Sequence, residues 1–144
     1  MPQTVRDVMT EDPRSLGISA SVVEAARLMR EEDIGSLPIT DDEKLVGVIT
    51  DRDITTRVVA EGSDPNGTSV GDVYSGDLIS VEPGQDIEVA VELMARHQVR
   101  RLPVVEDGRL VGVVAQADIA LRENETKTGA LVEAISKPSE GDRG

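Results

Sequence analysis

The sequence predicts a mixed α/β fold of the α+β type, built from two copies of one β-α-β-β-α unit. The first observation is an internal repeat: at an offset of 65 residues, segments 5–54 and 70–119 share 17 identities in 50 pairs without a gap. Each copy also contains an amphipathic helical stretch followed by two short β-rich runs joined by a polar turn. A unit of about 60 residues buries too little apolar surface to be stable alone, so we expect the copies to form one domain together.

The first copy spans residues 3–60. Thr4 and Asp7, at capping-box spacing, predict a helical turn over 4–9, which a loop and a short strand over 15–18 follow. Ser21 and Glu24 predict the start of a helix over about 21–33, because apolar residues then recur at helical spacing. Two β-rich runs, 37–40 and 45–50, form a hairpin, and a second helix runs from about residue 52 to residue 60.

The second copy spans residues 70–124 and follows a linker over 61–69 that is rich in Gly, Pro, Asn and Ser. Its turn, strand, helix and hairpin are expected at 70–74, 78–81, from Asp86, and at 102–105 with 110–115, before a helix from about Asp118. Asp107-Gly108 supplies the positive φ of a tight hairpin turn, which the DDEK turn of the first copy lacks. A C-terminal helix is expected over 125–138, and a disordered tail over 139–144.

The composition of the chain argues against several classes of site and partner. The chain has no cysteine and one histidine, so disulfides, thiol nucleophiles, cysteine-ligated metals and multi-histidine metal sites are excluded, and we expect no metal. A net charge of −13 repels nucleic acid and anionic membranes, and a chain with one Tyr and no Phe or Trp lacks stacking platforms for bases. The N-terminus has no signal-peptide features and no apolar run is long enough to span a membrane, so we expect a cytoplasmic protein.

The order of the elements, together with several motifs, resembles the CBS domain family. The motifs are a Val-x-Asp-Val-Met opening at 5–9, a Leu-Pro strand in both copies, and the corner 47–53, which reads GVITDRD and recurs as GVVAQAD at 112–118. Within the family, TDRDI, the SDPN linker, HQVRRLPV and the extra C-terminal segment are similar to stand-alone actinobacterial members. The resemblance covers about residues 3–124 and implies that the repeats pair by pseudo-twofold symmetry into one Bateman module.

The resemblance also implies a ligand. CBS modules typically sense adenosyl nucleotides, such as AMP, ADP, ATP, NAD or S-adenosylmethionine, and have no catalytic activity of their own. In the family motif the Thr hydroxyl meets a phosphate or ribose oxygen and the Asp carboxylate accepts both ribose hydroxyls, which implies these roles for Thr50 and Asp53. The chemistry agrees, because one carboxylate suits two neighbouring O–H donors. Gly47 permits close approach of a neighbour or a ligand to its strand.

Phosphate requires cations, which Arg100 and Arg101 supply just before the second Leu-Pro pair. In the family, basic residues at these positions approach the phosphate of a nucleotide whose ribose is held by the other repeat. We therefore predict one nucleotide-binding site at Gly47, Thr50, Asp53, Arg100 and Arg101. Arg52 and His97 are less specific candidates. Alternatively, the two arginines pair with surface carboxylates of this acidic chain.

A second, degenerate site is expected at the other corner. Ala115 replaces the hydroxyl residue there, Asp118 remains, and the partner positions Gly35 and Ser36 carry no charge. The motif also has a purely structural interpretation, because Thr-x-x-Asp is the spacing of a capping box that satisfies only the free N–H groups of a helix.

Two functions follow from these alternatives. The first is a non-catalytic regulatory module, commonly a homodimer in the family, that binds an adenosyl nucleotide of the AMP, ADP or ATP class between its repeats and signals to a protein partner. NAD and S-adenosylmethionine are other possible ligands, and no cofactor is required. The second is a ligand-independent dimeric interaction or stress-related scaffold in which Thr50 and Asp53 only cap a helix. No spacing resembles a nucleophile-base set, so we do not expect an enzyme.

Overall fold

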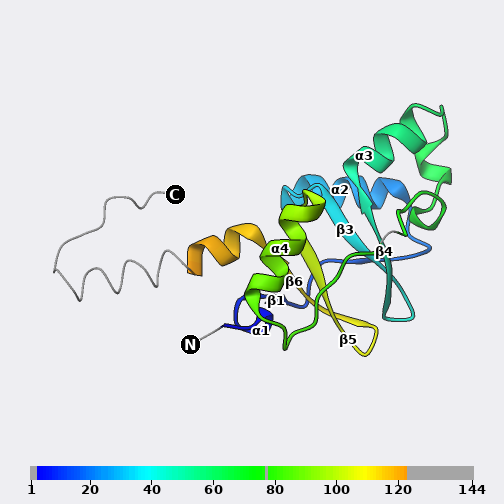
Figure 1. Ribbon diagram of the computed structural model, residues 1–144. Coiled ribbons are helices and arrows are strands. Elements are labelled where there is room, and N and C mark those ends of the chain that lie inside the picture. Colours follow the sequence, from blue (N-terminus) through cyan, green and yellow to red (C-terminus); the bar gives the residue numbers. More distant parts are fainter. Residues whose placement is uncertain (1–2, 77, 123–144) are drawn as a thin grey trace, which may run out of the picture.

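The computed structural model describes residues 3–76 and 78–122 (Figure 1). The first repeat contains α1 (Val5–Val8), β1 (Thr10–Glu11), β2 (Leu16–Gly17), α2 (Val22–Glu32), β3 (Ser36–Asp41), β4 (Lys44–Thr50), α3 (Asp51–Ile54) and a π-helical turn η1 (Thr55–Val59). The 3-10 turns η2 (Pro65–Gly67) and η3 (Val70–Asp72) lead to α4 (Ile87–His97), β5 (Arg101–Glu106), β6 (Arg109–Ala115) and helical residues 116–122. The predicted α+β order is confirmed, while the C-terminal helix and tail predicted for 125–144 lie outside the described residues.

The strand pairings show the predicted pseudo-twofold symmetry. In the first repeat β2 pairs parallel with β3, and β3 pairs antiparallel with β4. In the second, Val81 forms a parallel bridge to β5, and β5 pairs antiparallel with β6, so the predicted strand over 78–81 is reduced to this one bridge. The two hairpins meet where Lys44 of β4 pairs with Arg109 of β6. These two residues are 65 positions apart, so the axis that exchanges the repeats passes through this pair.

Each repeat also lends its N-terminal segment to the other, which the sequence did not predict. Strand β1, expected as a loop, pairs with β6 of the second repeat, and Ser75 at the equivalent position pairs with Val48 of β4. The Val5 N–H donates to the carbonyl of Gln85 at 2.8 Å, and the Val70 N–H donates to that of Ala20 at 2.7 Å. In Figure 1 the dark-blue α1 accordingly lies beside α4 rather than beside α2.

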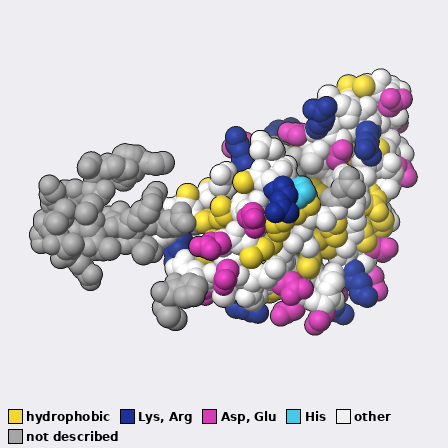
Figure 2. All heavy atoms as spheres, viewed as in Figure 1, with side chains coloured by type: hydrophobic (Ala, Val, Ile, Leu, Met, Phe, Trp, Pro, Cys, Tyr) yellow, Lys and Arg dark blue, Asp and Glu magenta, His cyan; other side chains and the backbone are white. Residues whose placement is uncertain are grey.

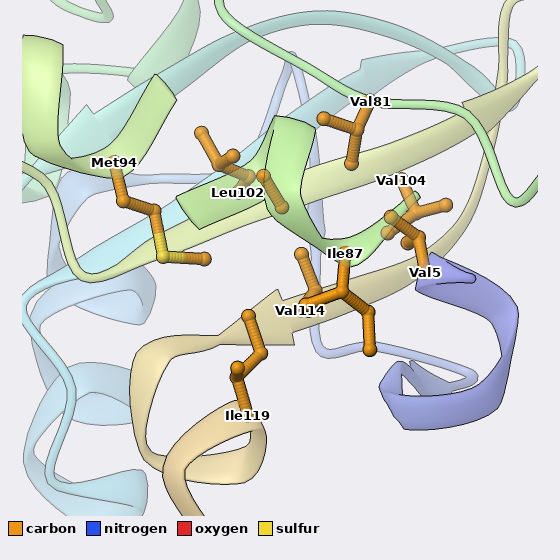
Figure 3. Close-up of a cluster of buried hydrophobic side chains, with 9 residues drawn as sticks. Val5, Val81, Ile87, Met94, Leu102, Val104, Val114 and Ile119 are labelled. Atoms are coloured by element: carbon orange, nitrogen blue, oxygen red, sulfur yellow. The ribbon is translucent and has the colours of Figure 1, made fainter. Parts of the chain in front are cut away.

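The exchange divides the apolar interior into two cores. One core contains Val5 of the first repeat together with Val81, Ile87, Ala90, Met94, Leu102, Val104, Val114 and Ile119 of the second. Figure 3 shows Val5 extending from α1 toward Ile87 and Val104. The other core contains Val70 and Val73 of the second repeat together with Val22, Ala25, Met29, Leu37, Ile39, Ile49 and Val58 of the first. Neither repeat therefore completes a core from its own residues, as the size argument requires.

Matched caps start the exchanged segments. In α1 the Thr4 N–H donates to Asp7 Oδ2 at 2.9 Å, and in η3 the Ser69 N–H donates to Asp72 Oδ2 at 3.4 Å. The hydrogen bond from the Thr4 backbone is the main reason why the pKa of Asp7 is lowered, since it stabilises the ionised carboxylate.

Both hairpin turns use positive φ angles. Asp107 and Gly108 have φ of 54° and 79°, as predicted, but Asp42 and Glu43 also have positive φ, at 55° and 70°. The expectation that the DDEK turn lacks this geometry is wrong, because closing a tight hairpin overrides the preference of an L-residue for negative φ.

Gly108→Ala tests what this geometry costs. A Cβ at Gly108 would meet no atom within 4 Å, so its effect comes from the backbone alone. We expect the substitution to lower the free energy of unfolding by about 1 kcal/mol in urea denaturation. Gly17→Ala is the control, because Gly17 has equally open surroundings without a positive φ. Equal effects of the two substitutions would contradict the prediction.

The surface carries mixed charge. Figure 2 shows acidic and basic side chains interspersed over one face of the molecule, without a continuous basic patch on that face. Within residues 3–76 and 78–122, no helix combines the length and the apolar composition needed to cross a membrane.

Candidate functional site

The Thr50 corner forms a complete capping box at the end of β4. The Thr50 N–H donates to Asp53 Oδ2 at 2.9 Å, and the Asp53 N–H donates to Thr50 Oγ1 at 3.0 Å. Arg57 Nε lies 3.9 Å from Asp53 Oδ1, and the Asp53 side chain is only 13% exposed. The structural alternative of the motif is thus realised, and Asp53 retains acceptor capacity mainly at Oδ1, because an ionised carboxylate has about four lone-pair sites.

Gly47 faces the other repeat. A Cβ at this position would lie 2.3 Å from Cδ2 of Tyr74 and 2.4 Å from the carbonyl oxygen of Ser75. These residues belong to the segment that the second repeat places against β4, where the Val48 N–H donates to the Ser75 carbonyl at 3.1 Å. The neighbour that approaches this glycine in the structure is therefore protein.

The equivalent corner in the second repeat leaves its carboxylate without a cap partner. Strand β6 ends at Ala115, which has no hydroxyl, and Asp118 lies half-buried in the helical segment 116–122. Within the described part of the chain, the Asp118 carboxylate takes part in no side-chain hydrogen bond or ion pair. The Gln116 N–H donates to the Arg100 carbonyl at 2.7 Å, which positions the start of β5 beside this corner.

A cavity of about 350 Å³ opens at the Asp118 corner, between the two repeats. Its apolar wall contains symmetry-related pairs from both repeats, Pro38 with Pro103 and Val48 with Val113, along with Ile34 and Leu102. Its polar and charged lining comprises Thr10, Asp12, Arg14, Glu32, Ser36, Arg101 and Asp118, with Pro13 and Ala115 completing the wall. Ionic groups thus surround an aliphatic slot to which both repeats contribute.

The structure brings some of the predicted site residues together. Arg101 and Asp118 line the same cavity, because Arg101 pairs with Ala115 across the β5–β6 hairpin. Of the two partner positions named for the second corner, Ser36 lines the cavity and Gly35 does not. Six other candidates are not among its lining residues: Gly47, Thr50, Arg52, Asp53, His97 and Arg100. Arg52, His97 and Arg100 are exposed. Because Arg101 lines the cavity and Asp53 does not, the grouping of Asp53 with Arg101 stays a prediction.

Three charged residues of the cavity were missed by sequence reasoning: Asp12, Arg14 and Glu32. Arg14 Nη2 lies 3.5 Å from Glu32 Oε2, so the loop after β1 is joined to the end of α2. No motif marks these positions, since a loop and a helix terminus 18 residues apart become neighbours only through the fold. Among the described residues, no group of three or more His, Cys, Asp or Glu side chains is arranged to hold a metal ion.

The family model for the CBS domain matches residues 5–60 and 70–124. Hypoxic response protein 1 of Mycobacterium tuberculosis is 40% identical over 136 residues, which cover 94% of this chain and 95% of the relative. The predicted similarity to stand-alone actinobacterial members is confirmed by this match.

Solved structures of related proteins are similar in fold to this chain. The crystal structure of Hypoxic Response Protein I with two coordinated zinc ions has a TM-score of 0.75 at 40% identity, covering 83% of this chain and 98% of that one. CBSX2 in complex with AMP has a TM-score of 0.74 at 29% identity, covering 87% and 98%. The CBS domain pair of protein MJ0100, in complex with 5-methylthioadenosine and S-adenosyl-L-methionine, has a TM-score of 0.73 at 26% identity, covering 88% and 99%. The chain belongs to the CBS domain family, because the family model matches both repeats and a relative is 40% identical over 94% of the chain.

Proposed function

We propose that this protein is a non-catalytic regulatory module that binds an adenosyl ligand between its two repeats. The observation that carries the proposal is the cavity of about 350 Å³, whose lining combines aliphatic side chains of both repeats with the side chain of Asp118. Small-molecule sites combine a mostly apolar wall with a few polar groups in about this range of volume. The complexes of CBSX2 with AMP and of MJ0100 with 5-methylthioadenosine and S-adenosyl-L-methionine support the ligand class.

The lining suggests a role for each group. Asp118 accepts hydrogen bonds from both ribose hydroxyls, because its carboxylate has no partner among the described residues. The adenine ring lies between the proline and valine side chains, which takes the place of the aromatic stacking that this chain lacks. Arg101, at the cavity wall, faces the 5′ substituent of the ligand.

The Thr50 corner is proposed as a second site. Asp53 there uses Oδ2 for the cap, so a ribose would meet Oδ1 in competition with Arg57. The symmetry of the repeats favours a ligand held by Thr50 and Asp53 with Arg100 and Arg101 near its phosphate, as the sequence predicts. The two corners would then differ in affinity, since only the carboxylate of Asp118 is free of a capping role.

Regulation would arise from the exchanged segments. A ligand in the cavity touches Thr10 and Val48 of the first repeat and Arg101 of the second, so it can favour one arrangement of the repeats over another. We propose that a partner protein reads this difference and that the module acts as a homodimer. Large apolar side chains that are exposed among the described residues, including those of Leu78, Val91, Val99 and Leu121, supply apolar surface for such an interface.

One observation favours the alternative function, a ligand-independent scaffold. The Thr50 and Asp53 side chains already satisfy each other's backbone N–H groups, so this motif has a structural use without any ligand. The scaffold hypothesis predicts that no nucleotide raises the melting temperature.

A thermal-shift screen tests both functions. The parent chain, Asp118→Asn and Asp53→Asn are heated with AMP, ADP, ATP, NAD and S-adenosylmethionine. A ligand at about 100 times its dissociation constant adds roughly 2.7 kcal/mol, a shift of several degrees. We expect Asp118→Asn to remove most of the shift and Asp53→Asn, whose amide oxygen preserves the cap, to retain most of it. The proposal fails if no ligand shifts the parent, and loss only in Asp53→Asn would move the site to the Thr50 corner.

A further inference from the structure

The ionic groups around the cavity indicate which adenosyl ligands it accepts. We propose, resting on the proposed function, that the Asp118 cavity selects an adenosyl ligand whose 5′ substituent carries no net negative charge, and rejects adenosine polyphosphates. S-Adenosylmethionine is the probe of this class that can be measured directly, because its 5′ substituent carries a sulfonium and an ammonium against one carboxylate.

The lining of the cavity contains more carboxylates than guanidinium groups. Three carboxylates, those of Asp12, Glu32 and Asp118, face the cavity together with two guanidinium groups, those of Arg14 and Arg101. Arg14 is already paired with Glu32, at 3.5 Å. One guanidinium therefore remains against two carboxylates. A phosphate-binding site requires the opposite balance, since each phosphate needs hydrogen-bond donors and positive charge.

The charged groups of the lining come from several different elements. Asp12 and Arg14 belong to the loop after β1, Glu32 ends α2, and Arg101 starts β5, so groups of both signs surround the slot. The substituent of S-adenosylmethionine can place its two cationic groups toward the carboxylates and its carboxylate toward the guanidinium of Arg101. A triphosphate instead brings several negative charges to a wall with an excess of carboxylates, on a chain whose net charge is −13.

Isothermal titration calorimetry on the full chain tests the inference. Affinities for S-adenosylmethionine, adenosine and ATP are compared in EDTA, which keeps magnesium from neutralising the triphosphate. We expect ATP to bind at least about tenfold more weakly than S-adenosylmethionine at low ionic strength. The ratio should shrink at high salt, because the Debye length falls from about 30 Å at 0.01 M to about 10 Å at 0.1 M.

Charge-neutralising variants locate the effect. Asp12→Asn combined with Glu32→Gln should improve ATP binding severalfold relative to S-adenosylmethionine. Glu61→Gln removes an exposed carboxylate outside the cavity lining and should leave the ratio unchanged. Asp118→Asn should abolish binding of the preferred ligand.

The outcomes separate this inference from the proposed function. If ATP binds as tightly as S-adenosylmethionine, or if the double variant leaves the ratio unchanged, the selectivity is refuted while the regulatory module stands. If S-adenosylmethionine binding survives Asp118→Asn but not Asp53→Asn, the ligand occupies the other corner and the inference fails. If no adenosyl ligand binds, both proposals fall together.

Discussion

Gly47→Ala is expected to lower the free energy of unfolding by about 3 kcal/mol or more, although it adds one methyl group. The added Cβ would lie 2.3 Å from the Tyr74 ring and 2.4 Å from the Ser75 carbonyl oxygen. A ring can rotate, but the carbonyl belongs to the backbone that pairs with Val48, so relief of the clash must separate the two repeats. Urea denaturation gives the loss. Tyrosine fluorescence reports the separation, because Tyr74 is the only aromatic residue.

Three comparisons make this result specific. Gly112→Ala at the symmetry-related position should cost less, because the nearest atoms, Met9 Sδ and the Thr10 carbonyl oxygen, lie at 2.9 Å. Gly76→Ala, which meets nothing within 4 Å, should have little effect. Adding Tyr74→Ala to Gly47→Ala should not restore stability, since the Ser75 carbonyl remains. Full rescue by this double variant would show that the ring alone excludes the methyl group.

Val70→Asp is expected to destabilise the protein by about 4 kcal/mol or more, because it places an unpaired carboxylate in an apolar core. Val70 belongs to the second repeat by sequence and has no exposed surface, yet its neighbours are the core residues of the first repeat. The damage should therefore reach α2. Urea denaturation measures the total loss, and native-state hydrogen exchange measures the protection of the α2 amides.

Val59→Asp is the matched control, since Val59 is 66% exposed and the chemical change is the same. Its effect should stay within about 1 kcal/mol. Should Val70→Asp weaken protection only in the second repeat, with α2 unaffected, each repeat would stabilise itself and the exchanged-core arrangement would be refuted.

Local sequence patterns predict much of the fold. The order of the main elements and both hairpins follow from local patterns, because apolar spacing, polar turns and capping residues act within a few positions of each other. The internal repeat adds the pseudo-twofold symmetry, because two similar units too small to be stable alone must cover each other. Family membership likewise depended on local motifs, chiefly the Gly47–Asp53 corner.

One local pattern has two interpretations, and the sequence does not distinguish them. The spacing from Thr50 to Asp53 suits both a cap and a ribose site, and the hydrogen bonds of the structure realise the cap. In the degenerate copy Ala115 has no hydroxyl to accept the Asp118 N–H, so the capping box does not form, and the Asp118 carboxylate has no partner among the described residues. A departure from the motif, which suggested a weaker site, can therefore leave a carboxylate more available for a ligand.

The sequence by itself determined the two-repeat organisation, the two hairpins and most of the helices. Only the tertiary structure decided that β1 crosses to β6, that Val5 and Val70 complete the opposite cores, and that Arg14 and Glu32 face Asp118 across one cavity. The physical reason is range: propensity, capping and turn geometry depend on neighbours along the chain. Burial, clashes and charge balance instead depend on which distant segments become neighbours in space.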